Sequence, residues 1–361
     1  MSNQEAISVI IPCYNAELHI KDCLESLLSQ NFKRNFEIIV IDDASKDKTV
    51  EIIKTFKFPN IKFSFLKKNS GPAAARNLGL IKAKGEYVLF LDVDDKISYK
   101  MLDKLYNLAI QKSYDMVFCD KQLIENSENQ RKNKYYYPND RDFNKSEITN
   151  ELLKRFTDPF EYSGIFLHYG KLIKRSLLIN NKIFFVEKLR YLEDEIFGWD
   201  TLSFTKNVAY LKEQLYSYYI YPRSNTARSD AFNKGFPISN FFIIKNHIKK
   251  SLLLRGLDED ICEKHSNHAF TYFIINSLVS YSMSIMLEKI NVYNGKKILT
   301  KFIKELITSK EVLKAAHQYQ PSIKESKWIP KAILTKSIFL IKFACNIRCK
   351  EILRKSRKTS S

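Results

Sequence analysis

The chain has 361 residues and a formal net charge of +19, and 45% of its residues are hydrophobic. This length suffices for two domains, and the apolar content argues against a disordered chain. We see no signal-peptide pattern and no run of about 18 apolar residues, so neither secretion nor a membrane-spanning helix is expected. Six scattered cysteines are typical of free thiols in a reducing cytosol. The charge is uneven, because residues 1–120 carry 17 basic and 16 acidic side chains and the remainder carries 42 and 24.

Strand-like and helix-like segments alternate along the first 120 residues. The apolar runs ISVIIP, FEIIVIDD, IKFSFLKK, YVLFL and DMVFCD predict five strands, at 7–12, 36–43, 61–68, 87–91 and 115–120. Apolar residues at helical spacing predict helices between them, at 20–28, 46–56, 71–85 and 98–112. This alternation predicts an α/β fold with a mainly parallel sheet and helices on both of its faces.

The chain changes character behind residue 120. Residues 125–150 are polar and punctuated, which is typical of a long loop or lid. From residue 150 onward helical patterns dominate, and those at 241–254 and 270–287 are rich in aromatic and aliphatic residues. The last 41 residues, from Pro321, hold 11 basic and two acidic side chains interleaved with apolar ones. We therefore expect a helix-rich C-terminal region after the sheet.

Carboxylates follow two of the predicted strands. Asp42 and Asp43 end the second strand, and Asp92, Asp94 and Asp95 follow the fourth. Open parallel sheets bind ligands beyond the carboxyl ends of their strands. The chain has neither G-x-G-x-x-G after its first strand nor a Walker A motif to hold phosphates. A divalent cation held by carboxylates is another way to neutralise a diphosphate, although Asp95 could instead only cap the next helix.

Four segments, in this order, resemble an inverting family 2 glycosyltransferase with the GT-A fold: SVIIPCYNAE, EIIVIDDASKDKT, NSGPAAARNLGLIKAKGEYVLFLDVDD and LEDEIFGWD. The similarity covers residues 1–120 closely and continues more loosely to residue 230. It implies a donor-binding half at 1–120 inside a GT-A nucleotide-sugar transferase domain at 1–230. A basic helical region at 231–361 would follow, for membrane attachment or oligomerisation.

The resemblance implies roles for residues at the carboxyl ends of the strands. Tyr14 would stack on the nucleobase, which offers a π-face, and Pro12 and Glu17 would shape and flank that contact. The other implied contacts are Asp43 to the base N3–H, Arg76 beside base and diphosphate, Asp92 at the ribose edge, Asp94 at the ribose or metal, and Asp95 at the metal. The metal would be Mn²⁺ or Mg²⁺. The alternatives are that Tyr14 is a core tyrosine and that Arg76 is an ordinary arginine on a helix surface.

A catalytic base is expected later in the chain. An inverting transfer is a single displacement, and it needs a carboxylate to take the proton of the acceptor hydroxyl. YLEDEIFGWD resembles the E-D motif of the family, which implies Asp194 as the base and Glu193 as its neighbour. Glu195 and Asp200 are further candidates, and acidic helix starts are also common without any catalytic role. The residues expected to reach the diphosphate after a loop closes are Arg223, Ser224 and Thr226.

The basic C-terminal region indicates a partner. KWIPKAILTKSIFLIKFACNIRCKEILRKSRK combines cations, a tryptophan and a broad apolar stripe, as in helices that lie in an anionic membrane interface. The alternative is an ordinary amphipathic helix packed on the domain or on a second subunit. The helices at 241–287 are candidates for a homodimer contact. No nucleic-acid recognition motif is visible, so we do not expect nucleic acid as a partner.

These patterns together predict a metal-dependent inverting glycosyltransferase. It would move a hexose or N-acetylhexosamine from a nucleotide sugar, UDP-linked by preference, to a saccharide or lipid-linked acceptor in cell-surface polysaccharide biosynthesis. We expect it in the cytoplasm, peripheral on the inner face of the cytoplasmic membrane. The alternatives are a sugar-phosphate nucleotidyltransferase, whose glycine- and basic-rich first loop is missing from PCYNAEL, and a non-catalytic basic membrane or nucleic-acid binding protein.

Overall fold

The computed structural model describes residues 5–126, 129–130, 135–158, 164–189, 192–220, 237–322 and 325–358. Contacts along the chain divide it into two units. Unit 1 comprises Met1–Thr149 and Ser163–Pro222, and unit 2 comprises Asn150–Tyr162 and Arg223–Ser361. The chain therefore leaves unit 1 for one short segment and returns to it before the rest of unit 2 is formed.

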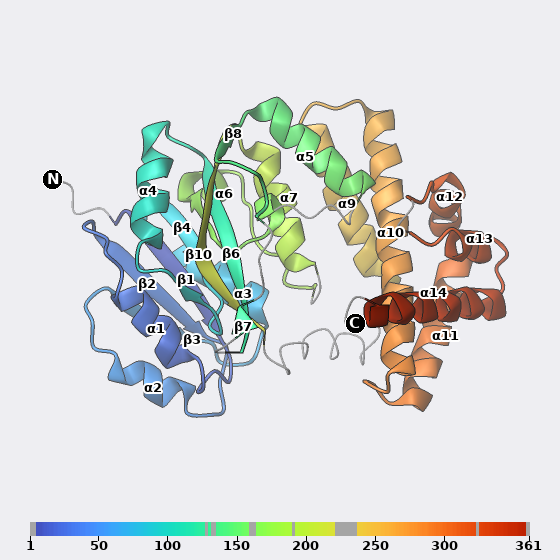
Figure 1. Cartoon of the computed structure of the whole chain (residues 1–361), viewed down its shortest axis with the longest axis horizontal. Coiled ribbons are helices and arrows are strands. Elements are labelled where there is room, and N and C mark those ends of the chain that lie inside the picture. The colour runs from blue at the N-terminus through green and yellow to red at the C-terminus, as the bar shows by residue number, and fades with distance from the viewer. Residues whose placement is uncertain are drawn as a thin grey trace. The chain divides into compact units, whose positions relative to one another are not determined.

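One sheet organises unit 1 (Figure 1). In chain order its strands are β1 (Ile7–Cys13), β2 (Phe36–Asp42), β3 (Ile61–Phe65), β4 (Tyr87–Phe90), β5 (Lys96–Ile97), β6 (Met116–Asn126), β7 (Asn129–Gln130), β8 (Arg141–Phe143), β9 (Lys171–Lys174) and β10 (Val208–Tyr219). Their order in the sheet is β3-β2-β1-β4-β9-β6-β10-β5, with β7 beside β6 and β8 beside β10. The long pairings β1–β2, β2–β3, β1–β4 and β6–β10 are parallel. The expected mainly parallel sheet is confirmed.

Helices cover both faces of this sheet. They are α1 (Ile20–Leu28), α2 (Thr49–Thr55), α3 (Pro72–Lys82), α4 (Met101–Gln111), the 3₁₀ turn η1 (Gly164–Phe166), α6 (Arg175–Asn180) and α7 (Glu193–Phe204). Alternate residues of the central strands separate the two layers. Val9 and Leu89 pack with α1, α2 and α4, whereas Ile10 meets α3 and Phe90 meets α7. The α/β class with flanking helices is thus confirmed.

Some expected element boundaries need correction. β1 continues beyond Pro12, which pairs with Ile41 inside the ladder. The strand β9 was not predicted, and it inserts antiparallel between β4 and β6. Its four residues, KLIK, are too few to carry a periodic signal. The segment 125–150, expected to be a loop, contains the short strand β8 and the start of α5 (Lys145–Thr157).

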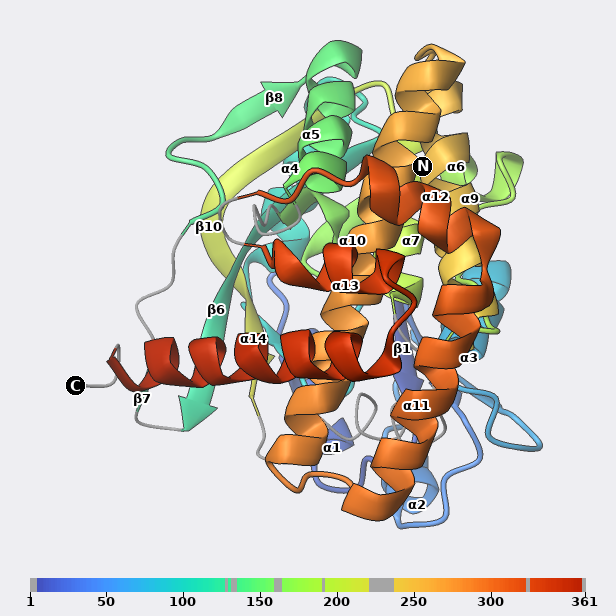
Figure 2. The same cartoon turned by 90° about the vertical axis from the view of Figure 1, so that its right-hand side faces the viewer.

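Unit 2 is built from helices (Figure 2). They are the part of α5 after Asn150, α9 (Ile238–Leu254), α10 (Glu259–Met286), α11 (Val292–Thr308), α12 (Lys310–Gln318), α13 (Trp328–Leu334) and α14 (Ile338–Lys358). α10 touches all the helices from α9 to α14 and buries 15 of its 28 residues. By length and composition alone α10 could cross a membrane, but 67% of its most apolar stretch is buried. A helix enclosed by other helices needs apolar residues on every side, which accounts for this composition.

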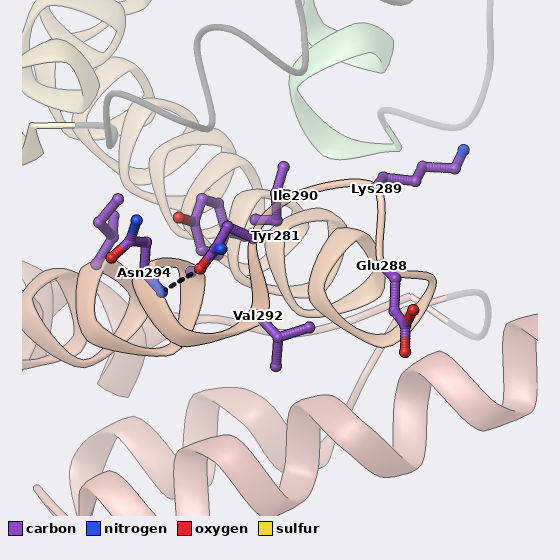
Figure 3. A pocket seen from close by; sticks show the side chains of 9 residues that line it. Tyr281, Glu288, Lys289, Ile290, Val292 and Asn294 are labelled. Atoms are coloured by element: carbon purple, nitrogen blue, oxygen red, sulfur yellow. Dashed lines mark hydrogen bonds between the residues drawn. The ribbon is translucent and has the colours of Figure 1, made fainter.

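A hollow of about 610 Å³ opens at the turn between α10 and α11 in unit 2 (Figure 3). Tyr281 and Ile290 line it, and Asn291 caps α11 by accepting a hydrogen bond from the Asn294 backbone N–H at 3.0 Å. Glu288 is the only carboxylate among its lining residues. The hollow therefore lacks the group of acids that the sequence predicts for donor binding.

Candidate active site

Hydrogen bonds join the loops that follow β1 and β2. The Asn15 backbone N–H donates to Ser45 Oγ at 2.9 Å, and Glu17 Oε2 accepts from the Lys48 backbone N–H at 3.0 Å. Just beyond β1, the Tyr14 side chain is left 43% exposed. An exposed ring at the end of a central strand is free to stack on a planar ligand. The alternative, a core tyrosine, is wrong.

Asp43 lies at the end of β2 and anchors the start of α3. It is buried, and its two carboxylate oxygens accept the backbone N–H groups of Ser70 and Gly71, each at 2.7 Å. Burial and the nearby charge of Asp42 raise the pKa of Asp43, although the two N–H donors act in the opposite direction. Each oxygen keeps a second lone pair, so the carboxylate retains acceptor capacity beyond these two bonds.

Arg76, on α3, is buried rather than on the helix surface. Its Nη2 donates to Asp92 Oδ1 at 2.7 Å, and its Nη1 lies 3.9 Å from Glu193 Oε1. The guanidinium also lies over the Phe185 ring, 5.2 Å from the ring centroid. Burial alone would lower the pKa of Arg76, but Asp92 and Glu193 reverse the effect and raise it. One arginine thus joins the DVDD turn to the E-D motif.

His168 is a residue of this site that the sequence did not reveal. It follows η1, is 4% exposed, and places Nε2 3.3 Å from Asp92 Oδ2 and Nδ1 4.0 Å from Asp194 Oδ2. Burial alone would raise the pKa of Asp92, but Arg76 and His168 hold it well below its usual value. A lone histidine in an apolar segment has no spacing signal, which is why the prediction missed it.

Two other buried side chains hold this cluster in place. Asn77 Nδ2 donates to the Phe185 carbonyl oxygen at 2.9 Å, and Asn77 Oδ1 accepts from the Phe185 N–H at 2.8 Å. Lys171 donates to two carbonyl oxygens of η1, at 2.9 and 3.3 Å. Burial lowers the pKa of Lys171 to about 7. These contacts fix the aromatic ring under the guanidinium and the turn before the histidine.

The other two acids of DVDD have different surroundings. Asp95 is 1% exposed and accepts hydrogen bonds from Tyr216 Oη at 2.6 Å and the Tyr219 N–H at 3.0 Å, which ties the turn to β10. Asp94 is half-buried, and burial together with the charge of Asp92 raises its pKa. Over the described ranges, no three His, Cys, Asp or Glu side chains form a complete metal cage. Mg²⁺ and Mn²⁺ usually take one or two protein carboxylates beside phosphate oxygens, and Asp94 suits that sparser arrangement.

The E-D motif opens α7. Acids in the first turn of a helix interact favourably with its N-terminus. The Glu193 side chain is 15% exposed and that of Asp194 is 32% exposed. Burial and the charge of Asp194 raise the pKa of Glu193 to about 7. Asp194 is the more accessible of the two carboxylates, and Glu193 turns toward the buried guanidinium of Arg76.

The predicted residues therefore fall into separate groups. Those at the ends of β1 and β2 are Pro12, Tyr14, Glu17 and Asp43. Those in one contact cluster are Arg76, Asp92, Glu193 and Asp194, with His168 between them. Asp94 and Asp95 share the turn of Asp92. The residues expected to reach the diphosphate, Arg223, Ser224 and Thr226, lie outside the described residues.

A glycine allows α7 to approach η1 closely. A Cβ atom added at Gly198 would lie 1.9 Å from the carbonyl oxygen of Phe166, closer than any real contact. The Phe197 ring stacks on the Phe185 ring with centroids 4.0 Å apart and planes inclined by 4°. This packing brings the first turn of α7 to the histidine that follows η1.

The sequence is similar to those of known glycosyltransferases. The family described as Glycosyl transferase family 2 matches residues 8–177. The glycosyltransferase GlyG of Streptococcus pneumoniae is 31% identical over 219 residues, which cover 59% of this chain and 70% of that protein. An uncharacterized glycosyltransferase of Haemophilus influenzae is 44% identical over 125 residues, which cover 33% of this chain and 50% of that protein.

Solved structures share the fold. Residues 1–349 of Staphylococcus aureus TarS, in complex with UDP-GlcNAc, match with a TM-score of 0.68 at 21% identity, covering 96% of this chain and 92% of that one. The mannosyltransferase PcManGT of Pyrobaculum calidifontis, in complex with GDP-Man and Mn²⁺, matches with a TM-score of 0.51 at 16% identity, covering 96% and 87%.

The sheet with its acidic edge and the later pair of acids agree with these similarities. The chain belongs to glycosyl transferase family 2 and has the GT-A fold. This membership favours a glycosyltransferase over the nucleotidyltransferase and the non-catalytic binding protein. The chain spans about half the length of several curated relatives, with 50% of the Haemophilus influenzae protein and 47% of the Staphylococcus aureus poly(ribitol-phosphate) β-N-acetylglucosaminyltransferase TarS.

Gly198→Ala tests the close approach of α7 to η1. Alanine is the better helix former by about 1 kcal/mol, so helix propensity alone predicts a more stable protein. The steric clash of the added methyl group with the Phe166 carbonyl should outweigh this gain. It should lower the free energy of unfolding by about 1–3 kcal/mol. Denaturant unfolding measures the difference, and its sign decides the matter. A variant at least as stable as the wild type would contradict the contact.

Proposed function

We propose that this chain is a metal-dependent, inverting transferase that moves a hexose or N-acetylhexosamine from a UDP-sugar to a saccharide or lipid-linked acceptor. The observation that carries the proposal is the guanidinium of Arg76, which reaches both Asp92 and Glu193. It joins the turn expected to bind the donor to the motif expected to supply the base. The names of relatives support the substrates, since TarS is solved with UDP and with UDP-GlcNAc and GgaA of Bacillus subtilis is a minor teichoic acid biosynthesis protein.

Asp194 is the base in this proposal. It takes the proton of the acceptor hydroxyl while that oxygen attacks C1 of the sugar, and the bond from C1 to the diphosphate oxygen breaks on the opposite face. Asp194 suits this role because its side chain is the more exposed of the E-D pair. With a pKa of about 7 and a partner in Arg76, Glu193 is better suited to holding the motif in place.

The donor is proposed to bind at the ends of β1 and β2. The exposed Tyr14 ring would stack on the base, framed by Pro12 and Glu17. Asp43, fixed by two backbone N–H groups, would use a remaining lone pair to accept from the base N3–H. Arg76 is already paired, so it offers less net positive charge to a diphosphate than an unpaired arginine would.

A divalent cation, Mn²⁺ or Mg²⁺, would supply the missing positive charge and stabilise the leaving diphosphate. The donor set fits such an ion, because Asp94 is a half-buried carboxylate whose pKa is raised by burial and by Asp92. A nearby dication would favour the ionised form and reverse that shift. We propose Asp94 as the direct ligand, and Asp95, held by β10, as a second ligand or as the support of the turn.

Asp94→Ala tests the metal proposal. It should lower the affinity for UDP in Mn²⁺ by at least about tenfold and leave the affinity in EDTA unchanged, because the carboxylate acts through the ion. Titration calorimetry in both buffers measures the two affinities. Unchanged UDP binding in Mn²⁺ would refute Asp94 as a ligand.

Asp95→Ala is the companion variant. Loss of this carboxylate leaves the buried Tyr216 hydroxyl without its acceptor, which should cost about 1–3 kcal/mol of unfolding free energy. Tyr216→Phe is the matched control, because it removes the hydroxyl together with its need for a partner. If Asp95→Ala abolishes the Mn²⁺ effect and keeps wild-type stability, Asp95 is a ligand rather than the support of the turn.

Asp194→Asn tests the base. After UDP-, GDP- and dTDP-sugars have been screened for hydrolysis, the variant should lower kcat at least about 100-fold with the active donor. Its affinity for UDP should stay at the wild-type value, since the asparagine keeps shape and removes only the basic oxygen. Glu195→Gln, at the next position of the same helix turn, is the control and should remain active. Retained turnover in Asp194→Asn would move the base to Glu193 or Glu195.

The enzyme is proposed to work at the inner face of the cytoplasmic membrane. α13 and α14 lie side by side in unit 2 (Figure 2). Three of their aromatic side chains are exposed: Trp328 by 68%, Phe339 by 73% and Phe343 by 56%. Exposed cations lie on or beside the same two helices: Lys327, Lys331, Lys336, Lys350 and Arg354. Lys331 Nζ lies 5.8 Å from the centroid of the Trp328 ring. Aromatic rings among cations suit an anionic lipid interface better than a protein interface, whose centre is depleted of charge.

The inner face of α14 packs within unit 2. Ile341, Cys345 and Cys349 are buried, and the Cys349 thiol lies 3.5 Å from the Val279 carbonyl oxygen of α10. The helix is therefore packed on its own domain, as one alternative supposed, and a membrane would meet only its outer face. The predicted homodimer contact at 241–287 remains a proposal, although α9 and α10 bury much of their apolar surface inside unit 2.

Vesicle binding tests the membrane proposal. The protein should sediment with phosphatidylglycerol vesicles at low salt, less at 1 M salt, and little with phosphatidylcholine vesicles. Phe339→Ala with Phe343→Ala should weaken binding at least about tenfold, because each ring buries its apolar surface in the lipid. Tyr293→Ala on α11, 78% exposed, is the control and should bind as the wild type does. Equal binding to both lipids would contradict the proposal.

A further inference from the structure

Two buried nitrogen atoms of the contact cluster face the E-D motif. Arg76 Nη1 lies 3.9 Å from Glu193 Oε1, and His168 Nδ1 lies 4.0 Å from Asp194 Oδ2. Neither nitrogen has a hydrogen-bond partner among the described residues. Both gaps exceed a hydrogen bond by about 1 Å, and an unmade hydrogen bond at a buried polar group is costly. Two such nitrogens face one motif, which indicates that they form hydrogen bonds to its carboxylates in another state of the enzyme.

The orientation of the His168 ring is fixed from the other side. Its Nε2 lies 3.3 Å from one oxygen of Asp92 and 3.4 Å from the other. An ionised carboxylate only accepts, so the contact with Asp92 requires a hydrogen on Nε2. In the neutral form of the ring Nδ1 is then the nitrogen that keeps a lone pair. The Tyr169 and Phe185 rings pack edge-on against the imidazole, with centroids 5.5 and 6.0 Å away. The ring is therefore held with Nδ1 toward the base, where the neutral form of the imidazole presents its lone pair.

A lone pair facing an ionised carboxylate gains nothing, and the two repel. The 4.0 Å separation between Nδ1 and the Asp194 carboxylate is longer than a hydrogen bond. When Asp194 becomes protonated, the same lone pair has a hydrogen to accept. The contact then changes from unfavourable to favourable, and it does so only after the proton of the acceptor has moved.

We propose that His168 is a positioning residue that stabilises Asp194 in its protonated form. In the transfer step the acceptor O–H bond breaks and an Asp194 O–H bond forms. The acceptor oxygen bonds to C1, and the C1–diphosphate bond breaks with its electron pair leaving on the diphosphate. The imidazole is neutral in this proposal: His168 gains no proton and accepts a hydrogen bond from Asp194 at Nδ1, while its Nε2–H stays directed at Asp92. The inference rests on the proposed role of Asp194 as the base.

Three substitutions separate this role from mere packing. His168→Phe keeps the ring shape and removes both nitrogens. His168→Asn can place an amide oxygen where Nδ1 lies, facing Asp194. His168→Gln can keep a donor where Nε2 lies, facing Asp92, and lacks the acceptor toward the base. A packing role predicts that activity follows stability, whereas the positioning role predicts that it follows the acceptor at Nδ1.

The measurements are kcat for transfer, UDP affinity in Mn²⁺ and the midpoint of thermal unfolding. His168→Phe should lower kcat about 10- to 100-fold and keep UDP affinity within about twofold. His168→Asn should recover part of kcat and His168→Gln should not. In the Asp194→Asn background, His168→Phe should cause no further loss, because the histidine acts through that base.

Several outcomes would overturn the proposal. They are a His168→Phe enzyme with wild-type kcat, a parallel loss of UDP affinity, or a His168→Gln enzyme as active as His168→Asn. The underlying function fails separately, if the wild type transfers from no nucleotide sugar or if Asp194→Asn stays active. If His168→Phe does not fold, the comparison of the asparagine and glutamine variants still decides the question.

Discussion

Three carboxylates follow a fully buried strand, and their mutual repulsion is the constraint on which the site depends. The three acids differ in how this repulsion is compensated. Asp92 is paired with Arg76 and His168, and Asp95 accepts two hydrogen bonds from β10. Asp94 is left with a raised pKa. Because the partners come from α3, from the segment after η1 and from β10, satisfying these charges draws three distant stretches of unit 1 to one turn.

The pairing of Arg76 with Asp92 and Glu193 determines how much positive charge is left for the donor diphosphate. An arginine between Asp92 and Glu193 offers less net positive charge to a diphosphate, and in the structure it links the E-D motif to the turn. This is why the proposed reaction includes a divalent cation that stabilises the leaving diphosphate. It also explains why Glu193, pressed against its acidic neighbour in a buried position, has a pKa near 7 while Asp194 retains access to solvent.

The sequence predicted the features that depend on neighbouring residues and on periodic patterns of apolar residues. Buried strands such as YVLFL and the apolar spacing of α1 follow from neighbouring residues alone, and so does the placement of acids at strand ends. β9 and His168 were missed because their positions depend on the closure of the sheet, which pairs residues 171–174 with two strands from other parts of the chain. The burial of Arg76 was missed for a similar reason, because it depends on residues far away in the sequence. Its partner Glu193 is more than 100 residues away, and no window of sequence contains both.

For the C-terminal helix α14, the sequence does not show which side of the helix is buried. A broad apolar stripe indicates that α14 has something to cover it, but not which part faces inward. In the structure the buried side of α14 includes small residues, Ala344, Cys345 and Cys349, whereas the stacked rings of Phe339 and Phe343 face outward. Packing for stability favours the opposite arrangement, since burying a large ring gains more than burying a methyl or thiol. The packing of unit 2 therefore does not require this exposed aromatic pair, whereas the proposed membrane contact does.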